Sequence, residues 1–287
     1  MSDPGIDKYI IKGGAEGRTR LAVIARVLAP STRELLDRFE PLAGKTLIDA
    51  GCGGGDVAFE LAARAGPGGL VIGIDIDEPK LEMAREEAVR QGLTNARFSR
   101  ADILGPWPAD SAQLVNLRFV LTHVPNPREL LRRASDALRP GGTIVVQDID
   151  YGGQFCDPPS PAVDQYCDVY VRTARHHGGN PFIGRSLASL LRETGFEGID
   201  GRLVQPYGRA GDIKQVAPLT LSAISETALA SGIASADTLQ QLTRELQAFV
   251  DRTDTTISFP RIFQAWGRKP HRLRKRRADL TPTRNQQ

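Results

Sequence analysis

The chain has 287 residues, 40% of them hydrophobic and 25% charged, which suffices for one elaborated domain or two small ones. No apolar run reaches 18 residues, and the first residues lack the basic-then-apolar order of a signal peptide, so neither a membrane span nor export is expected. Cys52, Cys156 and Cys167 are scattered, which argues against a disulfide framework or structural zinc and favours a reducing, cytoplasmic setting.

Charge is concentrated at one end of the chain. From Arg268 onward there are eight Lys or Arg and one Asp, a net charge of +7, which leaves about −4 for the rest. This stretch has no apolar periodicity, and residues 269–287 are predicted to form a disordered basic tail. Nonspecific contact with nucleic acid is possible for such a tail, but a solvated extension is the preferred interpretation, and no specific nucleic-acid partner is expected.

Residues 1–40 are predicted to form an N-terminal helical segment that closes over the ligand site. Apolar periodicity indicates a first short helix over 20–28, and the start signal Pro30-Ser31-Thr32 indicates a second over 34–39.

Residues 41–150 show strand and helix patterns in alternation. Strands are expected at 46–50, 70–75, 95–99, 112–117 and 143–149, with helices near 56–65, 78–91 and 127–138. The Pro-Gly-Gly run at 140–142 predicts a break before the fifth strand. This alternation predicts a parallel sheet with right-handed crossovers.

In residues 151–268 the regular alternation of strand and helix patterns ends. Helices are expected near 162–177, 184–194, 212–231 and 235–252, and strands at 198–205 and 258–267. The last two strands would form an antiparallel hairpin that completes the sheet, and the helices after the fifth and sixth strands would form a cap over a second ligand.

The most informative pattern is Asp49-x-Gly51-x-Gly53-x-Gly55, directly after the first strand, with Asp75 at the end of the second. Glycines allow positive φ and close approach of a ligand to the backbone. In an open α/β sheet this turn lies at the carboxyl edge, where ligands bind, and an acid after the second strand can accept hydrogen bonds from ribose hydroxyls. The pattern therefore indicates a nucleoside site.

The spacing of the acid and the glycines favours SAM over a dinucleotide. A dinucleotide fingerprint reads G-x-G-x-x-G, and an acid two residues before the first glycine would repel a pyrophosphate. The same acid suits the cationic amino-acid end of S-adenosylmethionine (SAM). A tight strand-to-helix turn without any ligand remains the plainer alternative.

From about Tyr9 to Pro270 the chain resembles bacterial small-molecule class I methyltransferases. The resemblance rests on the glycine turn, on Asp75, and on segments that read Ala101-Asp102, Leu121-Thr122-His123-Val124-Pro125-Asn126-Pro127, Leu138-Arg139-Pro140-Gly141-Gly142 and Gln264-Ala265-Trp266-Gly267. It implies an α/β, Rossmann-like sheet of seven strands with helical cap insertions. It says little about the methyl acceptor, because one fold hosts many chemistries.

The resemblance also implies roles for individual residues at the cofactor, whose product would be S-adenosylhomocysteine. The implied cofactor-binding residues are Arg20, Asp49, Gly51, Gly53, Asp75, Ile76, Asp102, Ile103 and Arg118. In this scheme Asp75 holds the ribose, Ile76 and Ile103 enclose adenine, and Asp102 accepts from the adenine amine. Asp102 could instead cap a turn, and Arg20 could be a solvated helix-face arginine.

Methyl transfer needs a base only where the acceptor must lose a proton. Candidates are His123, Tyr151 and His176, although His123 could equally be structural. No metal site is expected, because Arg118 has the wrong charge where metal-dependent relatives carry an acid. The segment Asn116-Leu117-Arg118-Phe119 also lacks the Asn/Asp-Pro-Pro-aromatic run of enzymes that methylate nucleic-acid bases.

The leading interpretation is a SAM-dependent methyltransferase of secondary metabolism that acts on a small, partly apolar metabolite. Two alternatives stay open: an RNA or protein methyltransferase that docks through the basic tail, and a catalytically silent SAM-binding interaction module. A homodimer is also possible.

Overall fold

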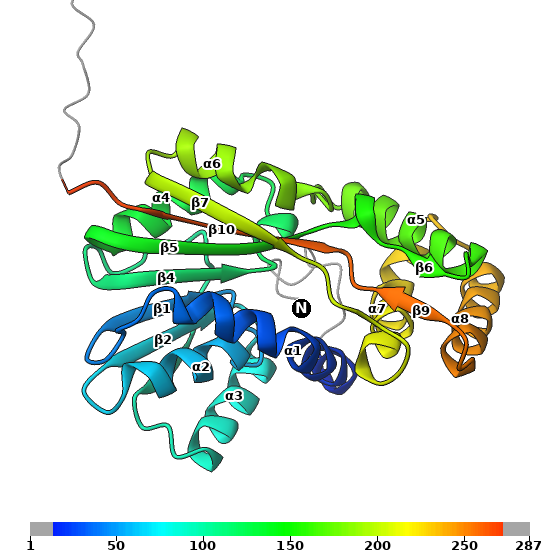
Figure 1. Cartoon of the computed structure of the whole chain (residues 1–287), viewed down its shortest axis with the longest axis horizontal. Helices are drawn as coiled ribbons and strands as arrows, with labels where there is room; N and C mark the ends of the chain where they lie inside the picture. Colours follow the sequence, from blue (N-terminus) through cyan, green and yellow to red (C-terminus); the bar gives the residue numbers. More distant parts are fainter. Residues whose placement is uncertain (1–13, 272–287) are drawn as a thin grey trace, which may run out of the picture.

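The computed structural model describes residues 14–271, and a seven-stranded sheet forms its centre (Figure 1). The strand order is β3-β2-β1-β4-β5-β10-β7. The strands are β1 Thr46–Ala50, β2 Leu70–Asp75, β3 Ala96–Arg100, β4 Ala112–Arg118, β5 Leu138–Asp150, β7 Glu197–Val204 and β10 Arg261–Arg268. β1 to β5 are parallel, whereas β10 pairs antiparallel with both β5 and β7. The predicted α/β class, parallel order and closing antiparallel strand are confirmed.

Helices cover both faces of this sheet, because its central strands are apolar on both sides. One face packs against α2 (Asp56–Ala65) and α3 (Glu78–Arg90) in a cluster that includes Leu47 of β1. The next residue, Ile48, points to the opposite face, where it belongs to a cluster with α4 (Pro127–Ala137) and α6 (Leu187–Glu193).

The N-terminal part departs from the prediction of two short helices. A single helix, α1, runs over Gly14–Asp37 with Pro30 inside it. Proline removes one helical hydrogen bond, but Pro30 is exposed, so water can satisfy the carbonyl group that loses its partner. The Ser31 hydroxyl also donates to the carbonyl of Leu28 at 3.0 Å. The helix therefore continues through the Pro30-Ser31-Thr32 segment that was predicted as the start of a second helix.

The predicted break at 139–142 is part of β5 itself. Ala112 faces Leu138 and Leu114 faces Thr143, so the four residues 139–142 bulge out opposite one residue of β4. Gly141 provides the positive φ, +78°, that this bulge requires.

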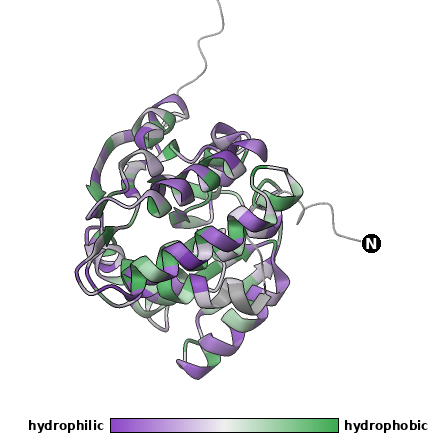
Figure 2. Cartoon of the chain, turned by 90° about the vertical axis from the view of Figure 1, so that its right-hand side faces the viewer, coloured by the Kyte–Doolittle hydropathy of each residue, from purple (hydrophilic) through white to green (hydrophobic). Residues whose placement is uncertain are grey.

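The cap consists of α5 (Pro161–His176), α7 (Asp212–Ala230) and α8 (Ala236–Asp251). These helices share a hydrophobic cluster with Val23 and Ile24 of α1. Figure 2 looks onto this end of the molecule, where the helices carry both hydrophilic and hydrophobic residues, as expected when one side of each is packed.

A small three-stranded sheet, β6-β9-β8, joins the cap to the core and was not predicted. Its strands are β6 Cys156–Asp157, β8 Tyr207–Gly208 and β9 Thr256–Ser258, and they are too short for alternation to reveal them. Short 3₁₀ turns lie at η2 Leu121–His123, η3 Tyr151–Gly153 and η4 Ile183–Ser186.

The structure extends slightly into the predicted tail. The Lys269 backbone N–H donates to the carbonyl of Gly142 at 2.8 Å, and the Lys269 ammonium bonds Asp110 at 2.8 Å. Lys269 is thus held against the core, so the predicted disordered tail does not begin at this residue. The remainder of that tail, like residues 1–13 of the N-terminal segment, lies outside the described residues. Within 14–271, no helix has the length and apolar character needed to cross a bilayer.

Candidate active site

The glycine turn connects β1 to α2 at the carboxyl edge of the sheet. Gly51, Gly53 and Gly55 all have positive φ, at +71°, +52° and +88°. A Cβ on Gly51 would lie 2.5 Å from Val120 Cγ2, so packing alone requires glycine there. A Cβ on Gly53 would meet only Leu21 Cδ1, at 3.7 Å. The backbone at Gly53 therefore borders space that the protein does not fill tightly.

The Asp75 carboxylate is fixed beside this turn. Its Oδ2 accepts from the Gly53 N–H at 2.8 Å, and its Oδ1 accepts from the Asp77 N–H at 3.0 Å. Each carboxylate oxygen has about two acceptor positions, so each could accept a further hydrogen bond from a ligand hydroxyl. The acid and the glycine turn thus form one unit, as a nucleoside site requires.

Asp49 carries an unsatisfied buried oxygen. Asn116, its register partner on β4, donates its amide to Asp49 Oδ1 at 2.8 Å, whereas Asp49 Oδ2 is buried without a partner in the described chain. Burial raises the pKa of Asp49 to about 6, although the Asn116 bond, the positive charge of Arg118 and the Ala58 N–H near the start of α2 oppose this. The Ala58 N–H is not within hydrogen-bond geometry of Oδ2, which keeps this oxygen without a bonded donor. A buried carboxylate oxygen without a donor is costly, and a cationic ligand group would satisfy it.

Arg118 ends β4 on the same face of the sheet. Its guanidinium lies 3.4 Å from Asp56 Oδ2, and its side chain is 14% exposed. With Asp56, Thr32 and Arg26 it lines a hollow of about 420 Å³ between α1 and α2. From this position the guanidinium could pair with a ligand carboxylate.

Arg20 is not a solvated helix-face residue. It is 9% exposed, and its Nε donates to Thr220 Oγ1 of α7 at 3.0 Å. The side chain therefore connects α1 to the cap, which rules out the solvated alternative.

The ends of β2 and β3 lie side by side, because Asp75 faces Arg100 in the sheet. Ile76 and Ile103, which follow these strands, are both partly buried. Asp102 is exposed, and its Oδ1 accepts from the Leu104 N–H at 2.8 Å, so it does cap a turn. Its second oxygen stays available for a ligand donor, so the two interpretations of Asp102 are compatible.

The two predicted catalytic side chains lie in different surroundings, since Tyr151 is buried whereas His123 is partly buried. His123 belongs to η2, and burial together with the charges of Arg20 and Lys80 lowers its pKa to about 3. The Tyr151 hydroxyl lies 3.0 Å from that of Tyr166, and its ring stacks on Tyr170 at 4.0 Å. Burial raises the pKa of Tyr151 well above its usual value. At pH 7 both groups are neutral, so neither is a strong base in this state.

His176, the third candidate base, is exposed at the end of α5. Its ring lies edge-on to that of His177.

Several residues of this region were not among the predicted site residues. Lys80 is buried in the first turn of α3 and pairs with Asp77 at 2.8 Å. Phe119 has φ +57° directly after β4 and stacks on Phe259, with ring centroids 6.2 Å apart. Strained non-glycine backbone is found disproportionately at functional sites. The remaining ones are Asn116, Tyr166, Tyr170 and Thr220. The i, i+4 spacing of Tyr166 and Tyr170 indicates from the sequence that they share one helix face. Asn116 and Thr220 come close to the site only because of the tertiary fold.

Comparison with known proteins assigns the chain to a family. A family model described as a methyltransferase domain matches residues 42–191, more than half of the chain. A nocamycin O-methyltransferase from Saccharothrix syringae is 39% identical over 182 residues, which span 58% of this chain and 64% of that protein. A demethylmenaquinone methyltransferase from Lactococcus lactis is 28% identical over 55% of this chain and 59% of its own length. The chain thus spans somewhat less than two thirds of these curated relatives.

Solved structures show the same fold. A Bacillus halodurans protein superposes with a TM-score of 0.56 at 21% identity, covering 84% of this chain and 99% of that one. A Haemonchus contortus phosphoethanolamine N-methyltransferase in complex with SAM gives 0.56 at 20% identity, covering 88% of this chain and 57% of that one. With its Rossmann-like sheet of seven strands and its matched domain, the chain belongs to the methyltransferase domain family.

Proposed function

We propose that the protein is a SAM-dependent methyltransferase that acts on a small-molecule acceptor held under the cap. The observation that carries the proposal is the buried, unpartnered Oδ2 of Asp49 beside the glycine turn. A cationic amino-acid group would satisfy this oxygen, whereas a pyrophosphate would be repelled by it. Family membership and the Asp75 geometry support the same cofactor.

In this proposal each end of the cofactor has its own partners. Asp49, Gly51 and Gly53 hold the methionine and ribose part, and the two Asp75 oxygens accept from the ribose hydroxyls. Ile76 and Ile103 enclose the adenine ring, and the free oxygen of Asp102 accepts from its amine. Arg118 pairs with the methionine carboxylate, and Arg20 closes the site from α1.

The acceptor is proposed to be a partly apolar metabolite of the secondary-metabolite kind. The cap shares a buried hydrophobic cluster with η3 that includes the aromatic rings of Tyr151, Tyr166 and Tyr170. Two relatives are named for such substrates: the nocamycin O-methyltransferase, and an aklanonic acid methyltransferase from Streptomyces that is 38% identical over 117 residues. No specific nucleic-acid partner is part of the proposal. A cytoplasmic setting and a homodimer remain predictions, and light scattering would check the latter.

Catalysis is proposed to depend on position more than on proton transfer. SAM, when bound, supplies an already activated methyl group on its sulfonium. The protein then has to align the acceptor with that methyl group and exclude water, and α1 and the cap are placed to do both. His123 and Tyr151, neutral at pH 7, would orient the acceptor through hydrogen bonds.

Calorimetry with SAM and the Asp75→Ala variant tests the cofactor assignment. Affinity should fall by about 1.5–3 kcal/mol, because two hydroxyls lose a charged acceptor. The SAM affinity of Asp75→Asn should lie between that of Asp75→Ala and that of the parent protein, since asparagine keeps one acceptor oxygen.

Asp136→Ala is the matched control, because Asp136 is an exposed aspartate whose side chain forms no hydrogen bond or ion pair within residues 14–271. Equal SAM affinity in a folded Asp75→Ala variant would remove Asp75 from the site. Formation of S-adenosylhomocysteine with a panel of phenolic and carboxylic metabolites would then separate an enzyme from a silent binding module.

A further inference from the structure

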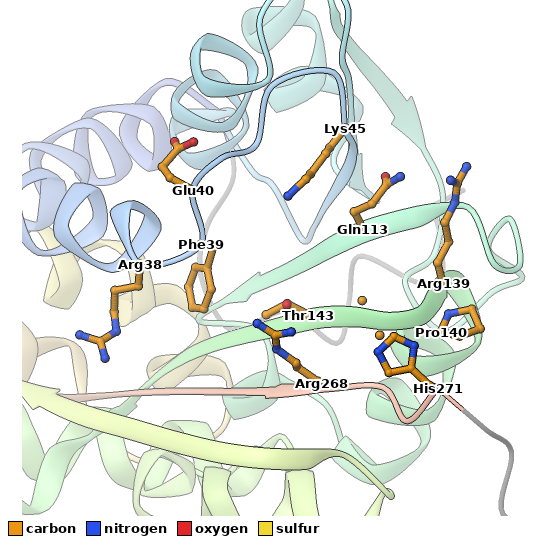
Figure 3. A pocket seen from close by; sticks show the side chains of 12 residues that line it. Arg38, Phe39, Glu40, Lys45, Gln113, Arg139, Pro140, Thr143, Arg268 and His271 are labelled. Carbon is orange, nitrogen blue, oxygen red and sulfur yellow. The ribbon is translucent and has the colours of Figure 1, made fainter.

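A second hollow lies at the opposite edge of the sheet from the glycine turn. It measures about 380 Å³ and is lined by residues that include Arg38, Lys45, Arg139, Arg268 and His271 (Figure 3). Lys45 directly precedes β1, whose five residues end at Ala50 beside the glycine turn. At 3.3 Å per residue, the strand separates the two regions by about 17 Å. The hollow is therefore distinct from the cofactor region.

Four of its side chains are permanent cations without a carboxylate partner in residues 14–271. Arg38, Lys45, Arg139 and Arg268 form none of the ion pairs found there, whereas the arginines and lysines elsewhere are largely paired, as in Arg33–Glu60 and Arg128–Glu193. Like charges in one concavity repel each other, and the low-dielectric walls focus their field. A bound anion would relieve this repulsion.

The single acid at the rim cannot neutralise them. Glu40 Oε2 accepts from the Leu42 N–H at 2.8 Å, and its Oε1 lies 3.7 Å from the Arg64 guanidinium. Arg38 is instead held over the Trp266 ring, with 4.7 Å between guanidinium carbon and ring centroid.

The wall of the hollow is built by specific contacts. The Gly141 N–H donates to the carbonyl of Lys269 at 2.9 Å, and the return bond from the Lys269 N–H to Gly142 measures 2.8 Å. This pair holds the end of β10 against the bulge of β5. His271 then lies over Gly141, where any side chain would overlap its ring. The hollow thus has a defined shape contributed by three separate segments of the chain.

We propose that this hollow binds a small oligophosphate anion, either free or as the phosphate chain of a nucleotide. A single carboxylate would neutralise one of four cations, whereas neighbouring phosphates concentrate several negative charges in a small volume, and both arginine and lysine bind phosphate well. The volume is that of a small-molecule pocket, which favours a compact ligand over an extended nucleic-acid strand. Lys45 and Arg268, on opposite sides of the hollow in Figure 3, are the principal ligands.

Calorimetry with inorganic tripolyphosphate on the full chain tests this site. The protein is first saturated with S-adenosylhomocysteine, so that a nucleoside site cannot confuse the result. Saturable binding of one tripolyphosphate is expected. The Lys45→Gln/Arg268→Gln double variant should weaken it at least about tenfold, since two charge-assisted contacts are lost. ATP in place of tripolyphosphate shows whether a nucleoside adds affinity.

The matched control is Arg132→Gln/Arg192→Gln, which removes the same charge from two exposed arginines outside the hollow. Binding in this control should stay within about twofold of the parent, with unchanged melting temperatures in both variants. Equal weakening in both pairs would reduce the effect to net charge and overturn the site. Absence of tripolyphosphate binding would also overturn the site. This holds even if single-stranded RNA binds through Lys45 and Arg268 instead. Because tripolyphosphate has no nucleoside, the result stands whether or not the chain binds SAM.

Discussion

At the scale of single residues, Asp49 shows how a binding group can lower stability. Its carboxylate is 2% exposed and one oxygen has no partner in the described structure. The folded-state pKa of about 6 exceeds the unfolded value near 4, so the folded protein favours the protonated form. The favourable contribution of Asp49 to the free energy of unfolding is therefore fully present below pH 4 and is lost as the pH rises through 6.

Asp49→Asn should accordingly raise the melting temperature of the ligand-free protein at pH 8, where the parent carries a buried charge. The gain should shrink as the pH falls from 6 to 4, because the parent side chain then becomes neutral as well. The same variant should bind S-adenosylhomocysteine more weakly, since the ligand ammonium loses its anion. Thermal melts at pH 8 and pH 4 with calorimetry measure both effects. A variant less stable than its parent at pH 8 would contradict the unsatisfied carboxylate.

His123 permits a second residue-scale prediction. With a pKa of about 3, the ring is neutral throughout the pH range in which the protein would be assayed. His123→Gln should thus leave the pH-rate profile unchanged in shape and lower turnover by less than about tenfold, whereas loss of a general base costs about 10²–10⁴. Steady-state rates from pH 5 to 9 provide the measurement. An inflection near pH 6.5 that disappears in the variant would establish the ring as the base.

At the scale of elements, two glycines of the β1–α2 turn have different roles, one in packing and one in ligand binding. Gly51 is confined by Val120, whereas Gly53 has only a distant contact with Leu21. Both have positive φ, so replacing either glycine with another residue would strain the backbone.

Gly51→Ala should therefore lower the melting temperature more than Gly53→Ala, because its new methyl group overlaps a buried side chain. Gly53→Ala should mainly weaken SAM binding, because its methyl group enters ligand space. Melting temperature and calorimetric affinity, compared for the two variants, give the test. If Gly53→Ala binds SAM as the parent does, the turn does not hold the cofactor.

The elements that could be predicted are those whose evidence is local. Most core strands are short apolar runs near glycine or proline, so composition and turn signals located them. The break at Pro30 was wrong because exposure, a tertiary property, decides whether the chain tolerates proline inside a helix. Asp49 and Asp75 were readable from spacing, whereas the contact between Arg20 and Thr220 joins residues 200 positions apart. No local pattern carries such information.

At the scale of the whole molecule, the cofactor region and the last described residues, 269–271, lie at opposite edges of the sheet. The glycine turn follows the carboxyl end of β1, whereas Lys269 and His271 lie beside the bulge at the start of β5. Residues 272–287 carry a net charge of +5, so the rest of the chain is slightly acidic. The described end of the chain, from which this charged segment continues, thus lies far from the region where methyl transfer is proposed.

Removal of residues 272–287 should leave SAM affinity and the turnover of an uncharged small metabolite within about twofold of the full chain, because an uncharged acceptor gains little from electrostatic attraction by the tail. Tripolyphosphate binding should also persist, since Lys45 and Arg268 remain. An enzyme that docks RNA or an acidic protein through the tail would behave differently: its KM for that acceptor would rise steeply on truncation, and in the full chain the KM would rise with salt. Parallel measurements at low and high ionic strength on both chains distinguish the two. A truncated chain that keeps its SAM affinity but loses turnover would place the tail in acceptor binding and overturn the proposal of a small metabolite enclosed by the cap.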